Sequence, residues 1–166
     1  MPSFPDGFLL GAATAGHQVE GGNVNSDVWK MEWAKPSMFT EPSGDACDHD
    51  HRYPEDVATL ASLGVNTYRF SVEWSRVEPE ESYFSRATLD HYRRMVAKCH
   101  EHGVPPVVTY NHFSVARWFS HEANWNGLTA VLTKSRYRGD AHPMSGIERM
   151  TGAPLAHDAS SPFVTA

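Results

Sequence analysis

Apolar and polar residues alternate along residues 65–74, which is the pattern of a β-strand with two different faces. The alternation places two sets of side chains on opposite faces: Tyr68, Phe70, Val72 and Trp74 on one, and Arg69, Ser71, Glu73 and Ser75 on the other. Residues 8–14 form a run of apolar and small residues, which predicts a buried strand. Residues 104–110 are rich in valine and predict a third strand.

Apolar residues at helical spacing separate these strands. The first predicted helix has Pro54 in its first turn, where the missing N–H costs nothing, and it ends at Gly64. Its apolar face would carry Val57, Leu60, Ala61 and Leu63. The second predicted helix covers residues 86–102, with apolar positions at Leu89, Tyr92, Val96 and Cys99. The order βαβαβ predicts an α/β fold with parallel strands and right-handed crossovers.

Two other regions are less regular. Residues 23–47 are typical of a long loop, in which Trp29 and Trp33 have the spacing of one side of a short helix. From residue 128 to residue 166 the periodicity disappears, and 17 of the 19 aromatic residues lie before residue 128. We therefore expect residues 1–127 to hold the core and residues 128–166 to be an atypical tail, either disordered or the product of a shifted reading frame.

Length and composition narrow the class of protein. The 166 residues suffice for one ordinary domain, whereas an eightfold βα barrel needs roughly 250. The net charge of −6 argues against a nucleic-acid partner.

The sequence also bears on where the protein is located. No apolar run approaches the roughly 18 residues of a membrane span, so we expect no membrane partner. No basic region precedes residues 8–15 as in a secretory signal, so we expect a cytoplasmic protein. Cys47 and Cys99 are expected to be reduced, with one disulfide as the alternative.

Polar side chains are predicted where the strands end. Gln18 follows the first strand, Arg69 and Glu73 lie on the second, and His112 follows the third. In a βα barrel these ends open onto one rim, and the amide and the imidazole each offer a donor and an acceptor to sugar hydroxyls. The alternation alone also fits an edge strand with one solvated face, and a lone Gln or His in a loop is more often a surface residue.

Two further groups of residues could carry chemistry. Residues 47–51 combine Cys, Asp and His, which are ligands of Zn²⁺ or Ni²⁺, but no second ligand cluster accompanies them. We therefore expect a polar segment leading into the helix, with no metal and no cofactor. Glu20, Glu73 and Glu78 could form the carboxylate pair of a glycosidase, but no sequence context marks any of them as catalytic.

Several stretches resemble the N-terminal part of the retaining β-glycosidases of glycoside hydrolase family 1. The resemblance covers about residues 4–126 and rests on these motifs: Gly11-Ala12-Ala13-Thr14-Ala15 with Gln18-Val19-Glu20-Gly21, His51-Arg52-Tyr53, Tyr68-Arg69-Phe70-Ser71, Trp74-Ser75-Arg76, and Pro106-Val107-Val108-Thr109 through His112-Phe113 to Arg117-Trp118. It implies a (β/α)8 TIM barrel, of which about the first three βα units are present, and the retaining hydrolysis of β-glycosides.

The resemblance also implies roles for single residues. By position, Gln18 and His112 would bind the glycone, and Arg69 would pair with the nucleophile and hold it ionised. The family's acid/base glutamate lies in a Thr-x-Asn-Glu-Pro motif and its nucleophile in a Thr/Ser-Glu-Asn-Gly motif; neither occurs here, so we predict no catalytic residue. We expect a β-glucosidase-like fragment that is inactive alone, with a β-glycoside as its small-molecule partner. The alternative is a non-catalytic sugar-binding or decaying fragment.

Overall fold

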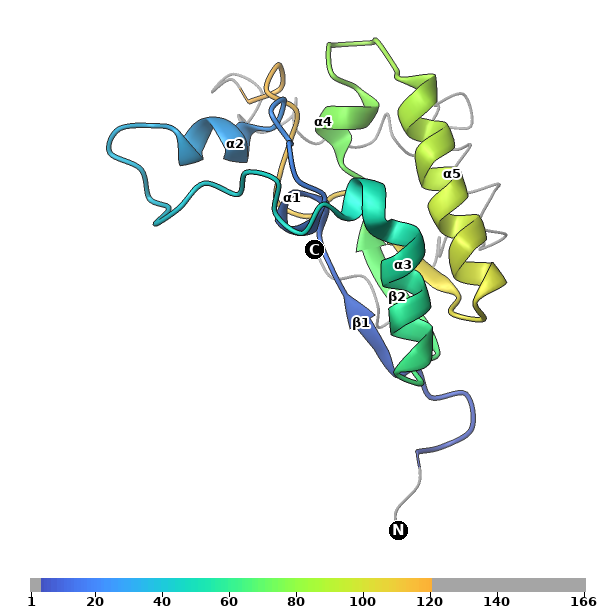
Figure 1. Cartoon of the computed structure of the whole chain (residues 1–166). Coiled ribbons are helices and arrows are strands. Elements are labelled where there is room, and N and C mark those ends of the chain that lie inside the picture. Colours follow the sequence, from blue (N-terminus) through green and yellow to red (C-terminus); the bar gives the residue numbers. More distant parts are fainter. Residues whose placement is uncertain (1–3, 121–166) are drawn as a thin grey trace.

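The computed structural model describes residues 4–120, which form a parallel three-stranded sheet with two long helices on one face (Figure 1). The strands are β1 (Gly11–Ala13), β2 (Thr67–Ser71) and β3 (Pro106–Thr109), in the order β1-β2-β3. The helices are α1 (Gly16–Val19), α2 (Asp27–Glu32), α3 (His49–Ser62), α4 (Trp74–Val77) and α5 (Arg86–Glu101). The predicted βαβαβ order is confirmed, and because β2 is the central strand the edge-strand alternative is wrong.

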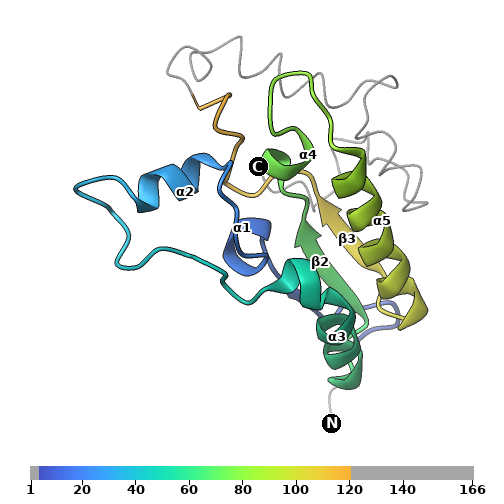
Figure 2. The ribbon, with the colours of Figure 1, turned by 45° about the horizontal axis from the view of Figure 1, so that its top comes forward.

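The main core lies between the sheet and the helices α3 and α5, which lie side by side over it (Figure 2). Tyr68, Phe70 and Val72 point to this side, and each is at most 2% exposed, as the alternation predicts. They meet Val57 of α3 and the buried residues of α5, which are Leu89, Tyr92, Met95, Val96 and Cys99. Each large apolar side chain buried in this way contributes roughly 1.5–3 kcal/mol. The core therefore fixes β2 under two helices and leaves its other face for polar groups.

Helix α3 begins earlier than predicted, whereas its end just before Gly64 agrees with the prediction. It begins at His49, so Pro54 lies inside it and not in its first turn. The helix extends in front of the proline because the carbonyl of Asp48 accepts hydrogen bonds from the backbone N–H groups of His51 and Arg52, while Pro54 removes only one helical bond. At the other end, Leu63 is 71% exposed because it caps the helix just before Gly64, which turns the chain at a φ of 77°.

Trp74 does not extend the second strand. Strand β2 ends at Ser71, and Trp74 begins α4, where the Glu73 side chain caps the helix by accepting a hydrogen bond from the N–H of Ser75. Trp74 consequently leaves the face it was expected to share with Tyr68 and packs in a second cluster with Val115, Ala116 and Phe119. The alternation predicts the strand, but a capping carboxylate decides where the strand stops.

The first strand is shorter and more exposed than expected. Only Gly11–Ala13 pair with β2, whereas Phe8, Leu9 and Leu10 are between 43% and 57% exposed. The prediction of a buried strand over residues 8–14 is wrong here, because β1 lies at the edge of the described sheet and α3 does not cover the segment that precedes it (Figure 1).

The short helix around Trp29 is α2, and both Cys47 and Cys99 are free thiols, so the disulfide alternative is wrong. Among residues 4–120, no helix combines the length and apolar character that crossing a bilayer requires. The boundary predicted at residue 127 and the tail of residues 128–166 lie outside the described residues.

Candidate functional site

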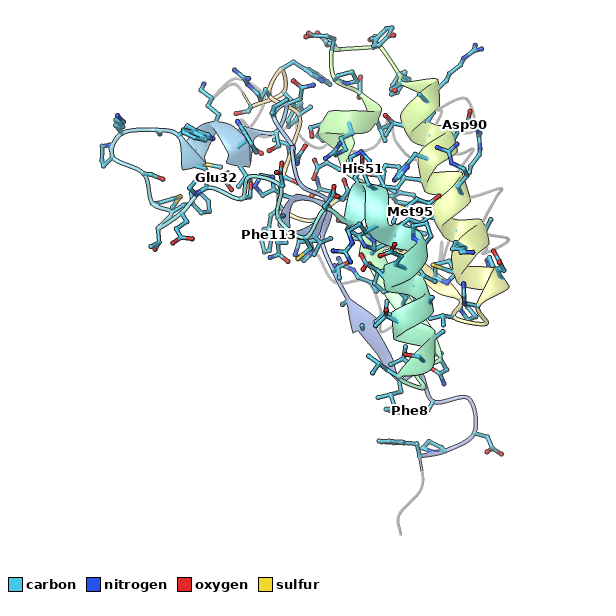
Figure 3. The ribbon with its side chains drawn as sticks, in the orientation of Figure 1. Phe8, Glu32, His51, Asp90, Met95 and Phe113 are labelled. Atoms are coloured by element: carbon cyan, nitrogen blue, oxygen red, sulfur yellow. The ribbon has the colours of Figure 1, made fainter. Side chains whose placement is uncertain are left out.

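The candidate site is built where the three parallel strands end. Thr14 directly follows β1, Ser71 ends β2, and Thr109 ends β3, so their polar groups gather at one edge of the sheet. The register pairs Ala13 with Arg69, and Ser71 with Thr109. Phe113, which follows β3, and Phe8, which precedes β1, lie toward opposite ends of the sheet (Figure 3). The strand ends thus place the candidate residues on one rim.

Arg69 links all three strand ends. Its Nε donates to Oγ1 of Thr109 at 2.7 Å, its Nη1 to the carbonyl of Thr14 at 3.1 Å, and its Nη2 to Nδ1 of His112 at 2.9 Å. The side chain is half-buried, and within residues 4–120 these three partners are neutral and no ion pair involves Arg69. The guanidinium therefore keeps its positive charge uncompensated by this part of the chain.

His112 is held beside this charge. Burial and the neighbouring Arg69 guanidinium both lower the pKa of His112 below its ordinary value, because each disfavours the imidazolium. The ring also meets Phe113 edge to face, with centroids 4.8 Å apart, while Phe113 itself is 84% exposed. The structure therefore brings together Arg69 and His112, two of the three residues singled out in the sequence.

Gln18 lies apart from these two. It is an exposed residue of α1 and forms no hydrogen bond with Arg69 or His112. Helix α1 is anchored by the N–H of Gly16, which donates to Oγ of Ser71 at 2.8 Å. The neighbouring His17 points inward, where its Nε2 lies 2.8 Å from Glu32. Since α1 follows β1, these anchors fix Gln18 at the same end of the sheet as His112.

A second polar cluster lies deeper, between α1, α4 and α5. Glu20 is 3% exposed. Its carboxyl group lies 3.0 Å from Nε of Arg76, which is close enough for an ion pair, although that nitrogen forms no hydrogen bond within the described residues. The Glu20 carboxyl group also accepts a hydrogen bond of 2.9 Å from the hydroxyl of Tyr92. Arg76 also donates to the carbonyl of Gly21 and lies 3.7 Å from Asp50. Burial raises the pKa of Glu20 to about 8, although Arg76 opposes the shift.

The amino-acid sequence does not predict this cluster. Tyr92 fits an apolar position of a helix, and no local pattern indicates a partner for Arg76. A tyrosine at a fully buried helical position is a usable signal, because a buried hydroxyl needs a hydrogen-bond partner. The Tyr92 hydroxyl finds two, since it also accepts a bond of 2.9 Å from the N–H of Glu73.

The other two carboxylates considered for catalysis are also engaged inside the protein. Glu73 is 2% exposed and accepts hydrogen bonds from the hydroxyls of Ser114 at 2.7 Å and Ser75 at 3.0 Å. Glu78 accepts a bond from the indole N–H of Trp74 at 2.8 Å. Such buried, hydrogen-bonded carboxylates stabilise loops and helix caps.

The histidines and aspartates of residues 48–51, which are candidate metal ligands but are not expected to bind a metal, pair with other side chains. His49 lies 2.6 Å from Asp56, His51 lies 2.6 Å from Asp48, and Asp50 faces Arg76 and His91. In the part of the chain that the structure describes, no three His, Cys, Asp or Glu side chains gather as a metal ion would require. Residues 47 and 48 precede α3, and residues 49–51 belong to its first turn.

Comparison with known structures defines the class of protein. The structure matches that of the β-glycosidase BGL167 with a TM-score of 0.82 and 52% identity, over 89% of this chain and 35% of that one. A family 1 β-glucosidase from Thermotoga maritima matches with a TM-score of 0.68 and 33% identity, over 74% of this chain and 29% of that one. The fold is that of a (β/α)8-barrel glycosidase, of which the described residues form a part.

Comparison of sequences gives the family. The sequence model of glycosyl hydrolase family 1 matches residues 1–138, and the chain belongs to that family. It is 40% identical to thermostable beta-glucosidase B of Thermobispora bispora over 149 residues, 87% of this chain and 32% of the relative. It is 35% identical to beta-glucosidase A of Thermotoga maritima over 132 residues, 75% of this chain and 30% of the relative. The chain thus spans about a third of the length of these relatives.

Proposed function

We propose that this chain forms part of the glycone-binding side of an O-glycosyl hydrolase of the β-glucosidase type. Gln18 and His112 would bind sugar hydroxyls, and Arg69 would support the carboxylate that attacks the anomeric carbon with retention. The observation that carries the proposal is the 2.9 Å hydrogen bond between Arg69 and His112 at the carboxyl edge of the sheet. A half-buried arginine and a neutral imidazole at that edge suit a polar, uncharged ligand beside a negative reacting group.

The free donors of Arg69 support its part of the proposal. A guanidinium has five N–H groups, and within residues 4–120 three of them donate to Thr109, Thr14 and His112. The two that have no partner in this part of the chain can donate to a carboxylate, a pairing that arginine favours. The positive charge would lower the pKa of that carboxylate and keep it ionised, as a glycosidase nucleophile must be.

The proposal assigns binding and positioning to these residues, not turnover. The 166 residues contain neither of the two glutamate motifs in which family 1 carries its acid/base and its nucleophile. We therefore expect the chain to bind sugars weakly, with dissociation constants of about 1 mM or higher, and to leave an aryl β-glucoside uncleaved. The cytoplasmic location and the absence of nucleic-acid partners stay predictions from composition.

Titration of the labelled full chain followed by NMR tests this function. Glucose serves as one probe and castanospermine as the other, because a β-glucosidase from Thermotoga maritima has been solved in complex with castanospermine. We expect the side-chain signals of Gln18 and His112 to move on titration. The Gln18 shift should disappear in His112→Ala. Both shifts should persist in His51→Ala, a matched control, since the His51 side chain is 78% exposed on α3.

Two results would contradict the proposal. One is a titration in which neither probe moves the signals of Gln18 and His112 while the core signals show a folded protein. The other is measurable hydrolysis of an aryl β-glucoside that is lost in Glu73→Gln, since it would make a buried structural carboxylate the catalytic group.

A further inference from the structure

We propose that Arg69 is a positioning residue that fixes the tautomer of His112, so that the imidazole presents its Nε2–H to the ligand as a hydrogen-bond donor. The part of this inference that concerns the ligand rests on the function proposed above. The tautomer itself is a property of the free protein and can be measured without any sugar.

The direction of one hydrogen bond carries the inference. Nη2 of Arg69 lies 2.9 Å from Nδ1 of His112. A guanidinium has only donors and stays protonated at any accessible pH, so Nδ1 must be the acceptor and carries no proton. A neutral imidazole has one proton, which must then lie on Nε2.

The donor that sets this tautomer is itself fixed. The Nε of Arg69 is tied to Thr109 at the end of β3, and Nη1 is tied to the carbonyl of Thr14 after β1. Three bonds from one planar group, one to the end of β1 and two to the end of β3, leave the guanidinium a single orientation. His112 therefore meets a donor at a set position, and the opposite tautomer would place two N–H groups face to face.

The ring also stays neutral, which the assignment requires. Burial and the charge of Arg69 both disfavour the imidazolium and lower the pKa of His112. Within residues 4–120 the Nε2 atom has no hydrogen-bond partner. The ring thus offers one N–H to a ligand, and the matching ligand group is an oxygen that accepts, such as a hydroxyl of a neutral sugar.

Other histidines of the chain provide internal controls of both kinds. His51 faces the carboxylate of Asp48 through Nδ1 at 2.6 Å, so its proton lies on Nδ1 when the ring is neutral. His17 faces Glu32 through Nε2 at 2.8 Å, and Nδ1 lies within reach of the Asn23 amide at 3.1 Å, so its proton lies on Nε2 as proposed for His112. Neither contact involves Arg69.

The experiment is a long-range ¹H–¹⁵N correlation spectrum of the full chain, recorded well above the pH at which histidines titrate. We expect the Nε2–H pattern for His112 and His17 and the Nδ1–H pattern for His51. In Arg69→Met, the Nδ1–H form of His112 should gain population by about fivefold, which is the effect of one net hydrogen bond. The patterns of His17 and His51 should stay unchanged.

A milder variant protects the test against loss of the fold. Thr109→Val removes one of the three anchors of Arg69 and should shift the ¹⁵N signals of His112 in the same direction by less. An Nδ1–H pattern for His112 in the original chain, or unchanged ¹⁵N signals of His112 in a folded Arg69→Met, overturns the inference. The expected tautomer together with a failure of both sugar probes would instead contradict the proposed function.

Discussion

Two arginines seven positions apart have opposite surroundings. Arg76 of α4 lies against the carboxyl groups of Glu20 and Asp50 and donates to a backbone carbonyl, so its partners, two acidic side chains among them, lie within the protein. Arg69 of β2 contacts a hydroxyl, a carbonyl and an imidazole, all neutral. The comparison separates an arginine that holds the fold together from one whose charge is left for something outside residues 4–120.

Burial explains why Glu20 needs Arg76 as a partner inside the protein. The Glu20 side chain is 2% exposed, and an isolated carboxylate there would lose its hydration without gaining any compensating interaction. Even with Arg76 and the Tyr92 hydroxyl beside it, its pKa is raised to about 8. Arg69 lies at the rim of the sheet and is only half-buried, so its uncompensated charge costs less.

The largest expected effect is that of Arg76→Met. The change leaves Glu20 buried without its cation and removes the bond to the carbonyl of Gly21, which should cost about 3 kcal/mol of unfolding free energy at about pH 9. The loss should be smaller at about pH 6, where Glu20 is protonated. Urea unfolding of both proteins at the two pH values measures it. An equal loss at both would show that Arg76 does not act through Glu20.

The next effect concerns the pH dependence of stability. The pKa of Glu20 is about 8 in the folded chain against 4.5 as the ordinary value, so the folded state binds the extra proton between these values. The contribution of this proton to the free energy of unfolding is fully present below about pH 4.5 and is lost as the pH rises through 8. Between these values the free energy of unfolding should fall by up to about 1.4 kcal/mol per pH unit. Glu20→Gln should flatten that slope. Glu101→Gln, an exposed change on α5, should leave it intact.

These two sites also show what the sequence can predict. Arg69 and His112 are found from the sequence because both lie at or after strands whose patterns are clear, and parallel strands end at the same edge. The Glu20 cluster is not found, because it joins residues 72 positions apart and Tyr92 reads as an apolar helical position. Local periodicity carries no information about such distant partners.

The ends of the helices and strands are the other feature that the sequence pattern predicts poorly. The apolar alternation continues through Trp74, yet the chain turns into α4 because Glu73 caps it. Likewise, Pro54 favours a helix start, but backbone bonds to Asp48 begin α3 at His49. In both places, hydrogen bonds accepted by a single residue decide where the element begins or ends, and the hydrophobic pattern does not show them.

Arg69 should contribute much less than Arg76 to the free energy of unfolding. Arg69→Met loses three hydrogen bonds, but its partners at the rim can turn to water, so we expect a loss of about 1 kcal/mol. Arg52→Met is the matched control, since Arg52 pairs with Glu55 at an exposed position of α3, and its loss should be about 0.5 kcal/mol or less. Unfolding in urea at one pH ranks the three arginines. A cost for Arg69 equal to that for Arg76 would remove the distinction between them.

The smallest effect is on the titration of His112, and it tests the charge of Arg69 directly. Because burial comes first and Arg69 second among the causes that lower the pKa of His112, Arg69→Met should raise that pKa only part of the way to its ordinary value. A folded-state pKa below the unfolded one means that His112 costs stability as the pH falls below the ordinary histidine pKa. The variant should therefore lose less stability than the original chain in that acid range. Histidine ring signals followed by NMR through the titration give the pKa, and Arg52→Met should leave it unmoved. An unchanged His112 pKa in Arg69→Met would mean that a negative group already neutralises Arg69.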